Sequence, residues 1–281
     1  MFKLRQKDAP LQAVISLLTA HKSWLVLTGA GVSAESGVPT YRNSEGVWQR
    51  KQPVTHQDFM AQPSARQRFW LRNMVGWRFM IDAQPNSAHQ ALVRLEQLGV
   101  VSSLVTQNVD GLHQRAGSRA VIDLHGRVDT VSCMACGFKQ PRAATQIWLE
   151  AQNPEYSLLA GAIAPDGDAD IDHLDYSSMQ VPDCPKCGGI LKPDAVFYGD
   201  SVPKERVRQA EQQLQQAAGL VVAGSSLMTY SGYRFCLWAQ QQGKPILLLN
   251  EGNTRADAIA TIKIGGSCAA VLQRWLTVAG A

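Results

Sequence analysis

The sequence predicts an α/β fold in which helices cover both faces of a parallel sheet and a small cysteine-containing module is inserted into the chain. Two observations predict it. Short apolar runs rich in β-branched residues alternate with longer helical patterns, which is typical of a parallel sheet. Two Cys-x-x-Cys pairs flank a loop-rich stretch with weak periodicity, which indicates a separate small module.

Composition and charge bound the class of protein. The chain has 281 residues, 45% of them hydrophobic, which is enough for a full core and one appended module. The formal net charge is +4, but Lys and Arg form no run, so nucleic acid binding has little support. No stretch approaches the ~20 apolar residues of a membrane span, and the N-terminal residues lack the apolar core of a signal peptide. We therefore expect a globular, cytoplasmic protein that binds neither nucleic acid nor membrane.

Four strands and four helices are predicted along the chain. Short apolar runs predict strands at 24–28, 100–106, 220–223 and 245–250. Apolar residues at helical spacing predict helices at 11–20, 87–98, 204–218 and 233–242. The sheet is therefore assembled from both ends of the chain.

The first predicted strand runs into a glycine-rich turn. Gly29-x-Gly31-x-x-Ala34 fits the dinucleotide fingerprint, in which glycines let the backbone approach a pyrophosphate. Dehydrogenases also carry an acidic residue about 20 positions on, at the end of a second strand, but the region 46–53 is not strand-like. The turn predicts a nucleotide site in a Rossmann-like domain and disfavours hydride transfer. The alternative is a turn that serves close helix packing.

Polar residues follow the second predicted strand. Gln107, Asn108 and Asp110 come directly after it, and His125 follows in a Leu-His-Gly sequence. In open α/β sheets ligands collect at the carboxyl ends of strands, so these side chains are placed where a cofactor would meet a substrate. Polar residues after a strand are also ordinary turn formers.

Two further strand ends carry polar residues, Gly224-Ser225-Ser226 and Asn250-Glu251-Gly252. Their hydroxyl and amide groups suit hydrogen bonds to ribose and adenine edges. They would serve equally well as loop caps.

The cysteines fall into two classes. Two Cys-x-x-Cys pairs without an export signal favour a tetrahedral zinc site over disulfides, with a redox dithiol as the competing interpretation. The four ligands would be Cys133, Cys136, Cys184 and Cys187. Four thiolates leave no open position, so the metal is expected to be structural. Cys236 stands alone and is expected to be a small buried hydrophobe.

The predicted domain boundaries divide the chain into three parts. Residues 1–43, 78–126 and 196–281 are expected to form a discontinuous Rossmann-like nucleotide-binding domain. Residues 44–77, rich in Arg and aromatic side chains, form a helical cap insertion, with amphipathic helices packed on the main domain as its simplest interpretation. Residues 127–195 form a zinc-ribbon insertion.

Together these motifs resemble those of the sirtuins, the NAD-dependent protein deacylases. The resemblance covers roughly residues 24–268. Besides the four cysteines, it rests on Gly29 to Ser33, Ser36 to Arg42, Thr106 to Asp110, Leu124 to Gly126, Val196 to Asp200, Gly224 to Leu227 and Asn250 to Gly252.

The resemblance implies NAD as cofactor, a structural Zn²⁺ and a role for each matched residue. Asp110 would accept a hydrogen bond from the nicotinamide carboxamide, and Asn108 would position ribose or water. His125, with an ordinary pKa near ~6.5, would be the general base acting through the ribose hydroxyls. The other interpretation of His125 is a hydrogen-bonded residue that caps the zinc module. The implied cofactor-binding residues are Gly29, Ala30, Gly31, Ser33, Tyr41, Arg42, Gln107, Asn108, Asp110, Gly224, Ser225, Ser226, Asn250, Glu251, Gly252 and Cys268.

The implied substrates are acyl-lysine proteins or peptides. Val196 and Tyr198 would wall the lysine tunnel, and the substrate chain would add as a strand between the segments 196–199 and 226–228. The implied products are nicotinamide, O-acyl-ADP-ribose and free lysine. A protein mono-ADP-ribosyltransferase is the alternative function, and a non-enzymatic zinc-ribbon interaction module is the third.

Three stretches resemble the class II branch of the family: Arg68 to Asn73 running on to Trp77, Ala164 to Asp168, and Tyr230 to Phe235. The sequence departs from the family pattern at Thr40, where Asp is usual, and at Ala34, where Ser or Thr is common. Four arginines of the cap would reach an acidic acyl chain, but structural roles are the favoured account of them. They are Arg66, Arg68, Arg72 and Arg78.

Overall fold

The protein is described by a computed structural model. It describes residues 9–40, 43, 45, 47, 53–157, 159, 162–163, 168–171 and 175–280. Two of the expected cofactor residues, Tyr41 and Arg42, lie outside the described residues.

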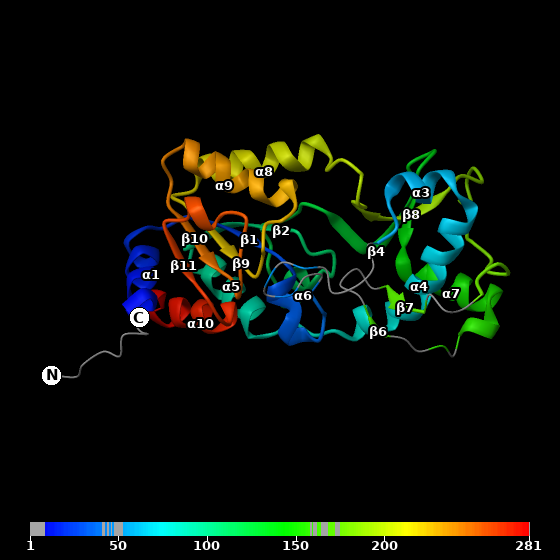
Figure 1. Cartoon of the computed structure of the whole chain (residues 1–281), viewed down its shortest axis with the longest axis horizontal. Helices are drawn as coiled ribbons and strands as arrows, with labels where there is room; N and C mark the ends of the chain where they lie inside the picture. The colour runs from blue at the N-terminus through cyan, green and yellow to red at the C-terminus, as the bar shows by residue number, and fades with distance from the viewer. Residues whose placement is uncertain are drawn as a thin grey trace.

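A six-stranded parallel sheet forms the centre of the large domain (Figure 1). Its order is β11-β10-β9-β1-β2-β3. The strands are β1 (Trp24–Thr28), β2 (Val101–Thr106), β3 (Val121–Asp123), β9 (Leu220–Ala223), β10 (Ile246–Leu249) and β11 (Ile262–Ile264). Both faces of the sheet are covered, which explains why the central strands are continuous apolar runs without alternation.

Helices form a layer on each face of this sheet (Figure 1). One layer contains α1 (Ala9–Ala20), α5 (Ser87–Gln97) and α10 (Cys268–Ala279). Its core includes the fully buried side chains of Leu18, Leu92 and Trp275. The opposite layer contains α8 (Lys204–Gln216) and α9 (Tyr230–Gln241), which bury Leu214 and Phe235 against the sheet.

The strand order reverses between β1 and β9. From β1 the chain builds the sheet outward through β2 to β3, and from β9 it builds in the other direction through β10 to β11. In open parallel sheets the loops after such a pair of strands diverge and leave a crevice at the carboxyl ends, where ligands bind. The crevice predicted from the strand ends therefore lies between the loops after β1 and β9.

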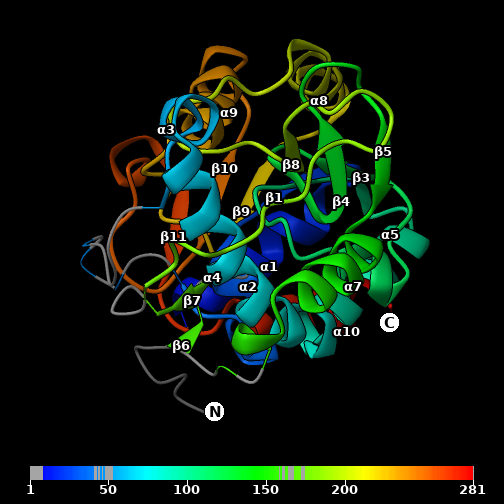
Figure 2. The same ribbon diagram turned by 90° about the vertical axis from the view of Figure 1, so that its right-hand side faces the viewer.

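A second, smaller module is built around an antiparallel sheet in the order β5-β4-β8. Its strands are β4 (Gly126–Cys133), β5 (Lys139–Pro141) and β8 (Leu191–Ala195). Seen from the outer end of this module, α3 (His56–Ala61), α4 (Pro63–Asp82) and α7 (Arg142–Gln152) lie around the sheet (Figure 2). A short pair, β6 (Ala162–Ile163) and β7 (Ala169–Asp170), packs beside α4.

Short helical segments complete the described elements. They are α2 (Ala30–Ser33), α6 (Leu112–Ala116) and the 3₁₀ turns Ala34–Ser36, Pro154–Tyr156 and Asp257–Ile259. Both α2 and α6 follow strands of the large sheet, so they lie at its carboxyl edge.

The predicted α/β fold with a small inserted module is confirmed, and so are the four predicted strands and four predicted helices, with ends that differ by up to three residues. The interpretation of the stretch between the cysteine pairs as loop-rich was wrong in one part, because it contains α7. This helix buries Arg142, Thr145, Gln146 and Leu149, so its inward face is mostly polar and shows no apolar periodicity. The strands β3 and β11 are three residues long, too short for a periodic pattern. The C-terminal helix α10 was also not predicted.

The division into domains stays a prediction. The boundary expected between residues 77 and 78 falls within α4, which continues to Asp82. We propose that this boundary lies at the end of the helix.

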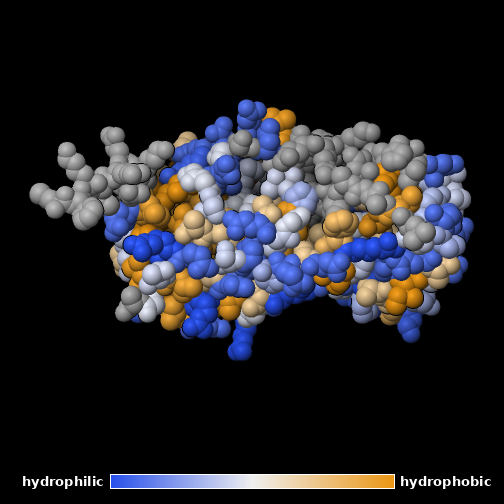
Figure 3. Space-filling view, turned by 90° about the horizontal axis from the view of Figure 1, so that it is seen from below, coloured by the Kyte–Doolittle hydropathy of each residue, from blue (hydrophilic) through white to orange (hydrophobic). Residues whose placement is uncertain are grey.

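No described helix is long and apolar enough to cross a membrane. On the face seen in Figure 3, hydrophilic and hydrophobic residues of the described chain are interspersed in small groups. Such a mixed surface is ordinary for a globular protein.

Candidate functional site

Three glycines bring the backbones after β1 and β9 into contact. The Gly31 amide donates to the Gly224 carbonyl at 2.8 Å. A Cβ on Gly31 would lie 2.8 Å from the Gly224 Cα, and a Cβ on Gly29 would lie 2.7 Å from the Ser225 Cβ. No side chain fits at these positions. The predicted turn residues on the two strands therefore meet at the point where the strand order reverses.

Asn108, Ser33 and Asp110 form a connected chain of hydrogen bonds beside this glycine contact. Asn108 Nδ2 donates to the Ser33 Oγ at 3.0 Å and to the Gly29 carbonyl at 3.1 Å. The Ser33 hydroxyl in turn donates to Asp110 Oδ2 at 2.7 Å. The loop after β2 is thus bound to the turn after β1. Asn108 and Asp110 form one polar group with Ser33, although they lie 75 and 77 positions from it in the sequence.

Asp110 is a half-buried acceptor. Burial raises the pKa of its carboxyl, while the Leu112 amide at 2.9 Å and the Ser33 hydroxyl act in the opposite direction. A carboxylate in this setting accepts hydrogen bonds in a place from which bulk water is largely excluded. The geometry fits the expected contact with a carboxamide N–H.

Gln107 connects the ends of β2, β1 and β9. Its Nε2 donates to the Ser225 Oγ at 2.8 Å and to the Thr28 carbonyl at 3.2 Å. Its Oε1 accepts from the Thr229 hydroxyl at 3.4 Å. The Gln107 side chain therefore lies at the carboxyl edge of the sheet, as the sequence predicted.

His125 has a defined tautomer because its two nitrogens have different partners. Nδ1 lies 3.0 Å from the Gln107 carbonyl, which only accepts, so Nδ1 carries the proton. Nε2 lies 2.8 Å from the Ser231 Oγ and, in the neutral ring, accepts from that hydroxyl. The pKa of His125 is lowered to about 4, mainly by burial; the hydrogen bond to Gln107 acts in the opposite direction, and the charges of Arg206 and Arg234 add to the lowering. The ordinary pKa expected from the sequence was therefore too high.

The backbone around His125 connects the large domain to the small module. Gly126 has φ +77°, and a Cβ there would lie 2.0 Å from the Asp194 carbonyl oxygen, so only glycine lets β4 start beside the end of β8. The Val196 amide donates to the His125 carbonyl at 2.8 Å. The imidazole itself contacts residues of the large domain, which argues against the interpretation of His125 as a cap of the zinc module.

The expected substrate residues Val196 and Tyr198 follow β8 and lie outside the sheets. Val196 is fixed by its bond to the backbone of His125, and the Tyr198 carbonyl accepts from the His56 amide at 2.9 Å. The segment is thus held between the His125 loop and the start of α3.

Four further expected cofactor residues lie after β10 and at the start of α10. The Asn250 amide donates to the Ile264 carbonyl at 3.1 Å, and its side chain bonds to the carbonyls of Glu251 and Gly252. Cys268 Sγ lies 3.9 Å from the Gly31 carbonyl oxygen. This contact brings the start of α10 to the glycine turn after β1.

Ser226, the last expected cofactor residue of the β9 loop, is held through its backbone. Its carbonyl accepts from the Arg255 amide at 2.9 Å. The next residue, Leu227, is buried and has φ +58°, a conformation that side chains rarely adopt. The loop therefore has a tightly specified shape.

The four cysteines of the two pairs form one cluster. Their sulfur atoms all lie within 4.8 Å of one another, with 3.6 Å between Cys133 and Cys187 and 3.7 Å between Cys136 and Cys184. Tetrahedral Zn–S bonds of about 2.3 Å place sulfurs about 3.8 Å apart, so the donor set fits a structural Zn²⁺. The amide of Cys136, and then that of Ala135, lower the pKa of the Cys133 thiol. The expected zinc site is supported, and Cys236 is fully buried in the core, as predicted.

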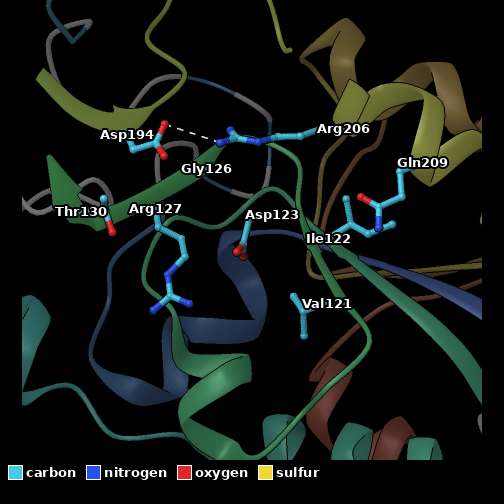
Figure 4. A pocket seen from close by; sticks show the side chains of 9 residues that line it. All are labelled: Val121, Ile122, Asp123, Gly126, Arg127, Thr130, Asp194, Arg206 and Gln209. Carbon is cyan, nitrogen blue, oxygen red and sulfur yellow. Dashed lines mark hydrogen bonds and ion pairs between the residues drawn. The ribbon is translucent and has the colours of Figure 1, made fainter. Parts of the chain in front are cut away.

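A pocket of about 240 Å³ lies on the other side of the Leu-His-Gly segment (Figure 4). Its charged side chains are mostly paired: Arg206 lies 3.5 Å from Asp194, and Arg127 pairs with Asp129. The pocket includes none of the catalytic residues expected from the sequence. Its lining residues are Val121, Ile122, Asp123, Gly126, Arg127, Thr130, Asp194, Arg206 and Gln209.

The cap arginines Arg66, Arg72 and Arg78 make structural contacts. Arg66 donates to the carbonyls of Phe59 and Met60 at the end of α3, at 2.9 and 3.0 Å. Arg72 forms a buried ion pair with Asp168 at 3.2 Å, and Arg78 lies 2.9 Å from Glu150. These contacts support the structural account of the cap arginines.

Sequence reasoning missed Ser231 as a site residue. It lies on α9, 106 positions from His125, and its stretch was noted only as a family resemblance. It also missed a buried polar group beneath the site, in which Thr28 Oγ1 lies 2.9 Å from Thr106 Oγ1 and 2.9 Å from His113 Nε2. The Leu-His at 112–113, which follows the polar residues after β2, was the available signal.

The profile of the Sir2 family matches residues 29–231, a segment that contains the glycine turn, the polar residues after β2 and β9, and all four cysteines. The chain belongs to the Sir2 family. It is 52% identical over 262 residues to an NAD-dependent protein deacetylase of Bordetella bronchiseptica, which covers 93% of this chain and 96% of that protein.

Other Sir2 proteins resemble this one in sequence or structure. The mitochondrial NAD-dependent protein lipoamidase sirtuin-4 of Bos taurus is 45% identical over 258 residues, 91% of this chain and 82% of that protein. A solved complex of a Sir2 homologue with NAD has a TM-score of 0.73 at 31% identity and covers 96% of this chain and 93% of that one. A Sir2 complex with a p53 peptide and NAD⁺ has a TM-score of 0.73 at 28% identity, with 96% and 98% covered. The Rossmann-like domain with its zinc-binding module is thus the Sir2 fold.

Proposed function

We propose that this chain is an NAD-dependent protein lysine deacylase that releases nicotinamide, O-acyl-ADP-ribose and free lysine. The observation that carries the proposal is the setting of His125. Its half-buried, neutral imidazole is held at the carboxyl edge of the sheet, next to the polar group of Gln107, Asn108 and Asp110. The deacetylase and lipoamidase activities named for its relatives support this assignment.

The residues at the reversal point fit NAD. The contact between Gly29, Gly31 and Gly224 leaves bare backbone where a pyrophosphate would approach, and the polar side chains around it suit ribose and carboxamide groups. When bound, NAD supplies a ribose carbon that an acyl oxygen attacks as nicotinamide leaves, and a 2′-hydroxyl that takes over the acyl group. The residues expected to hold it are Gly29, Ala30, Gly31, Ser33, Tyr41, Arg42, Gly224, Ser225 and Ser226, with Asn250, Glu251, Gly252 and Cys268 on the adenosine side.

Each side chain of the polar group has its own proposed task. Asp110 accepts from the carboxamide of nicotinamide, because it is a half-buried carboxylate that the Leu112 amide and the Ser33 hydroxyl hold in place. Asn108 positions ribose or water, and Gln107 holds the ribose hydroxyls. His125 takes the proton of a ribose hydroxyl at Nε2, the nitrogen that carries no proton in the neutral ring. Burial keeps this nitrogen unprotonated at neutral pH.

The acyl-lysine substrate is proposed to enter beside His125. Val196 is fixed to the His125 backbone, so a chain that pairs with the 196–199 segment would bring its lysine to the imidazole. Val196 and Tyr198 would then line the lysine tunnel, with the 226–228 segment on the other side of the substrate chain.

Mono-ADP-ribosyl transfer is not favoured, because the deacetylase and lipoamidase activities named for the relatives are both deacylations and the site provides a base for that reaction. We also propose that the protein belongs to the class II branch, in line with its similarity to sirtuin-4. It is further proposed to act in the cytoplasm without nucleic acid or membrane partners.

The proposed function is tested with a panel of acyl-lysine peptides and NAD. Acetyl, longer, branched and lipoyl groups are included, and nicotinamide and O-acyl-ADP-ribose are measured by mass spectrometry. Nicotinamide release should require an acyl peptide, and formation of O-acyl-ADP-ribose should fall by about 100-fold or more in His125→Ala. Equal activity in His125→Ala would contradict the assignment. Labelled ADP-ribose that appears on protein without an acyl peptide would favour the transferase instead.

A further inference from the structure

The start of α9 contacts the imidazole of His125. Ser231 lies in the first turn of this helix, and its Oγ is 2.8 Å from His125 Nε2. Within the described part of the chain, this hydroxyl is the only hydrogen-bond partner of that nitrogen. The mechanism proposed above gives Ser231 no task.

The two hydrogen bonds of His125 have different functions. The Gln107 carbonyl holds Nδ1–H, so a proton taken up in the reaction must go to Nε2. A serine hydroxyl both donates and accepts. It donates to Nε2 of the neutral ring and, after rotation about its Cβ–Oγ bond, accepts from the N–H of the protonated ring. Ser231 is thus a partner for His125 in both of its protonation states.

A glycine lets α9 approach closely enough for this contact. A Cβ on Gly232 would lie 2.5 Å from Gln107 Oε1, so the helix start packs directly on the Gln107 side chain. The backbone carbonyl of the same Gln107 holds the other nitrogen of His125. The imidazole is therefore held from both sides by two segments that are packed against each other.

We propose that Ser231 is a positioning residue for His125. Its hydroxyl holds Nε2 in orientation until a ribose hydroxyl takes its place at the single lone pair, and it accepts from Nε2–H after the proton has been transferred. The proposal rests on the proposed deacylase function. It separates two stages of the reaction. Loss of neutral nicotinamide moves no proton and does not need the base, whereas transfer of the acyl group to the 2′-oxygen does.

The test compares these stages in Ser231→Ala and Ser231→Thr. In Ser231→Ala, exchange of labelled nicotinamide into NAD in the presence of an acyl peptide should stay within about twofold of wild type, while O-acyl-ADP-ribose formation falls about tenfold. Ser231→Thr keeps a hydroxyl and should recover most of the lost rate. Equal losses of exchange and product formation, or no loss of either, would overturn the proposal.

A matched control and a second measurement complete the test. Ser16→Ala removes an exposed helical serine from α1 and should change neither rate. Imidazole ¹⁵N NMR of the full chain without substrate tests the bond itself, since losing a donor to Nε2 shifts its resonance. An unchanged Nε2 resonance in Ser231→Ala refutes the proposal whatever the activity of the wild type. If the resonance shifts but wild type turns over no acyl peptide, the deacylase assignment fails while the Ser231 contact stands.

Discussion

At the scale of single residues, His125 shows how burial sets the pH range of a base. An exposed histidine would be half protonated near pH ~6.5 and would lose its function as a base below that value. Burial lowers the pKa of His125 to about 4, and its neutral form keeps both hydrogen bonds. The group is therefore available as a base over the whole physiological range.

This environment predicts the acid limb of the pH profile. A base must be unprotonated, so kcat/KM for the acyl peptide should not fall through a midpoint near pH ~6.5 but only as the pH approaches about 4. The profile should be measured between pH 5 and 8, with circular dichroism at each pH to verify folding. A midpoint between pH 6 and 7 in folded protein would show that the imidazole is more exposed than the structure has it.

The residue scale also shows what the sequence could predict about the site. Asn108, Asp110 and His125 stand in short motifs directly after strands, and local sequence was enough to select them. Ser231 is a single hydroxyl on a helix that begins three residues before its predicted start. Its task depends on a contact with a residue 106 positions away, which no local pattern contains.

At the scale of elements, the contact between the turns after β1 and β9 requires glycine, which has no side chain, at positions 31 and 224. Gly31 approaches Gly224 so closely that any Cβ would collide with backbone atoms, which cannot move aside as a flexible side chain can. The two turns would have to separate to admit a methyl group.

The substitution Gly31→Ala should therefore weaken NAD binding. We expect a rise in Kd of about tenfold or more, and a loss of about 1–3 kcal/mol in the free energy of unfolding, because the inserted methyl group overpacks the turn. Titration calorimetry and urea unfolding measure the two effects. Gly265→Ala is the matched control, since nothing lies within 4 Å of a Cβ there. Unchanged NAD affinity in Gly31→Ala would show that the turn does not contact the cofactor.

The cysteine cluster stabilises the small module. With four thiolates at tetrahedral spacing the metal has no open position, so its removal acts through structure. Cys184→Ser should lose the zinc and about 3 kcal/mol or more of stability. Metal analysis, unfolding and activity measurements test this.

The large domain supplies the proposed NAD contacts, so NAD binding should survive zinc removal better than acyl-peptide turnover does. Cys236→Ala removes another buried cysteine and should keep one zinc per chain. Full turnover by zinc-free protein would contradict a structural role of the metal.

The element scale explains which parts of the fold could be predicted. Strands buried on both faces appear as continuous apolar runs, so the central strands were predicted with small errors at their ends. The helix α7 faces inward with Arg142 and Gln146, and Arg142 donates to Asn73 Oδ1 and to Gln146 Oε1. Its apolar side chains Ile147 and Trp148 are exposed, so only the three-dimensional packing shows that the polar side is buried.

At the scale of the whole molecule, two buried histidines make the fold sensitive to acid. His89 and His113 are almost fully buried, with ring centroids 4.8 Å apart. Burial lowers the pKa of His89 to about 4 and also lowers that of His113 well below its ordinary value, with the His89 charge as a second cause for His113. The unfolded chain binds protons near pH ~6.5, so between these values it holds more protons than the folded protein.

Stability should therefore rise with pH between about 4 and 6.5. Lowering the pH from 7 to 5 should cost about 2 kcal/mol for each buried histidine. Urea unfolding at the two pH values measures the loss, and His89→Gln should reduce it, whereas His21→Gln, at an exposed position, should not. An equal pH dependence in wild type and His89→Gln would rule out this source of acid sensitivity.

The reversal of strand order between β1 and β9 determines when the cofactor site can form during synthesis of the chain. The two strands pair although nearly 200 residues separate them, and the Gly31 to Gly224 contact forms only when both are in place. During synthesis the polypeptide must therefore reach beyond β9 before the cofactor crevice exists, and long-range parallel pairing of this kind forms slowly. A chain that ends before residue 220 contains the glycine turn and His125 but lacks β9 and the Gly224 loop that contacts this turn. Binding of NAD thus distinguishes complete molecules from truncated ones, and it stabilises only the complete ones.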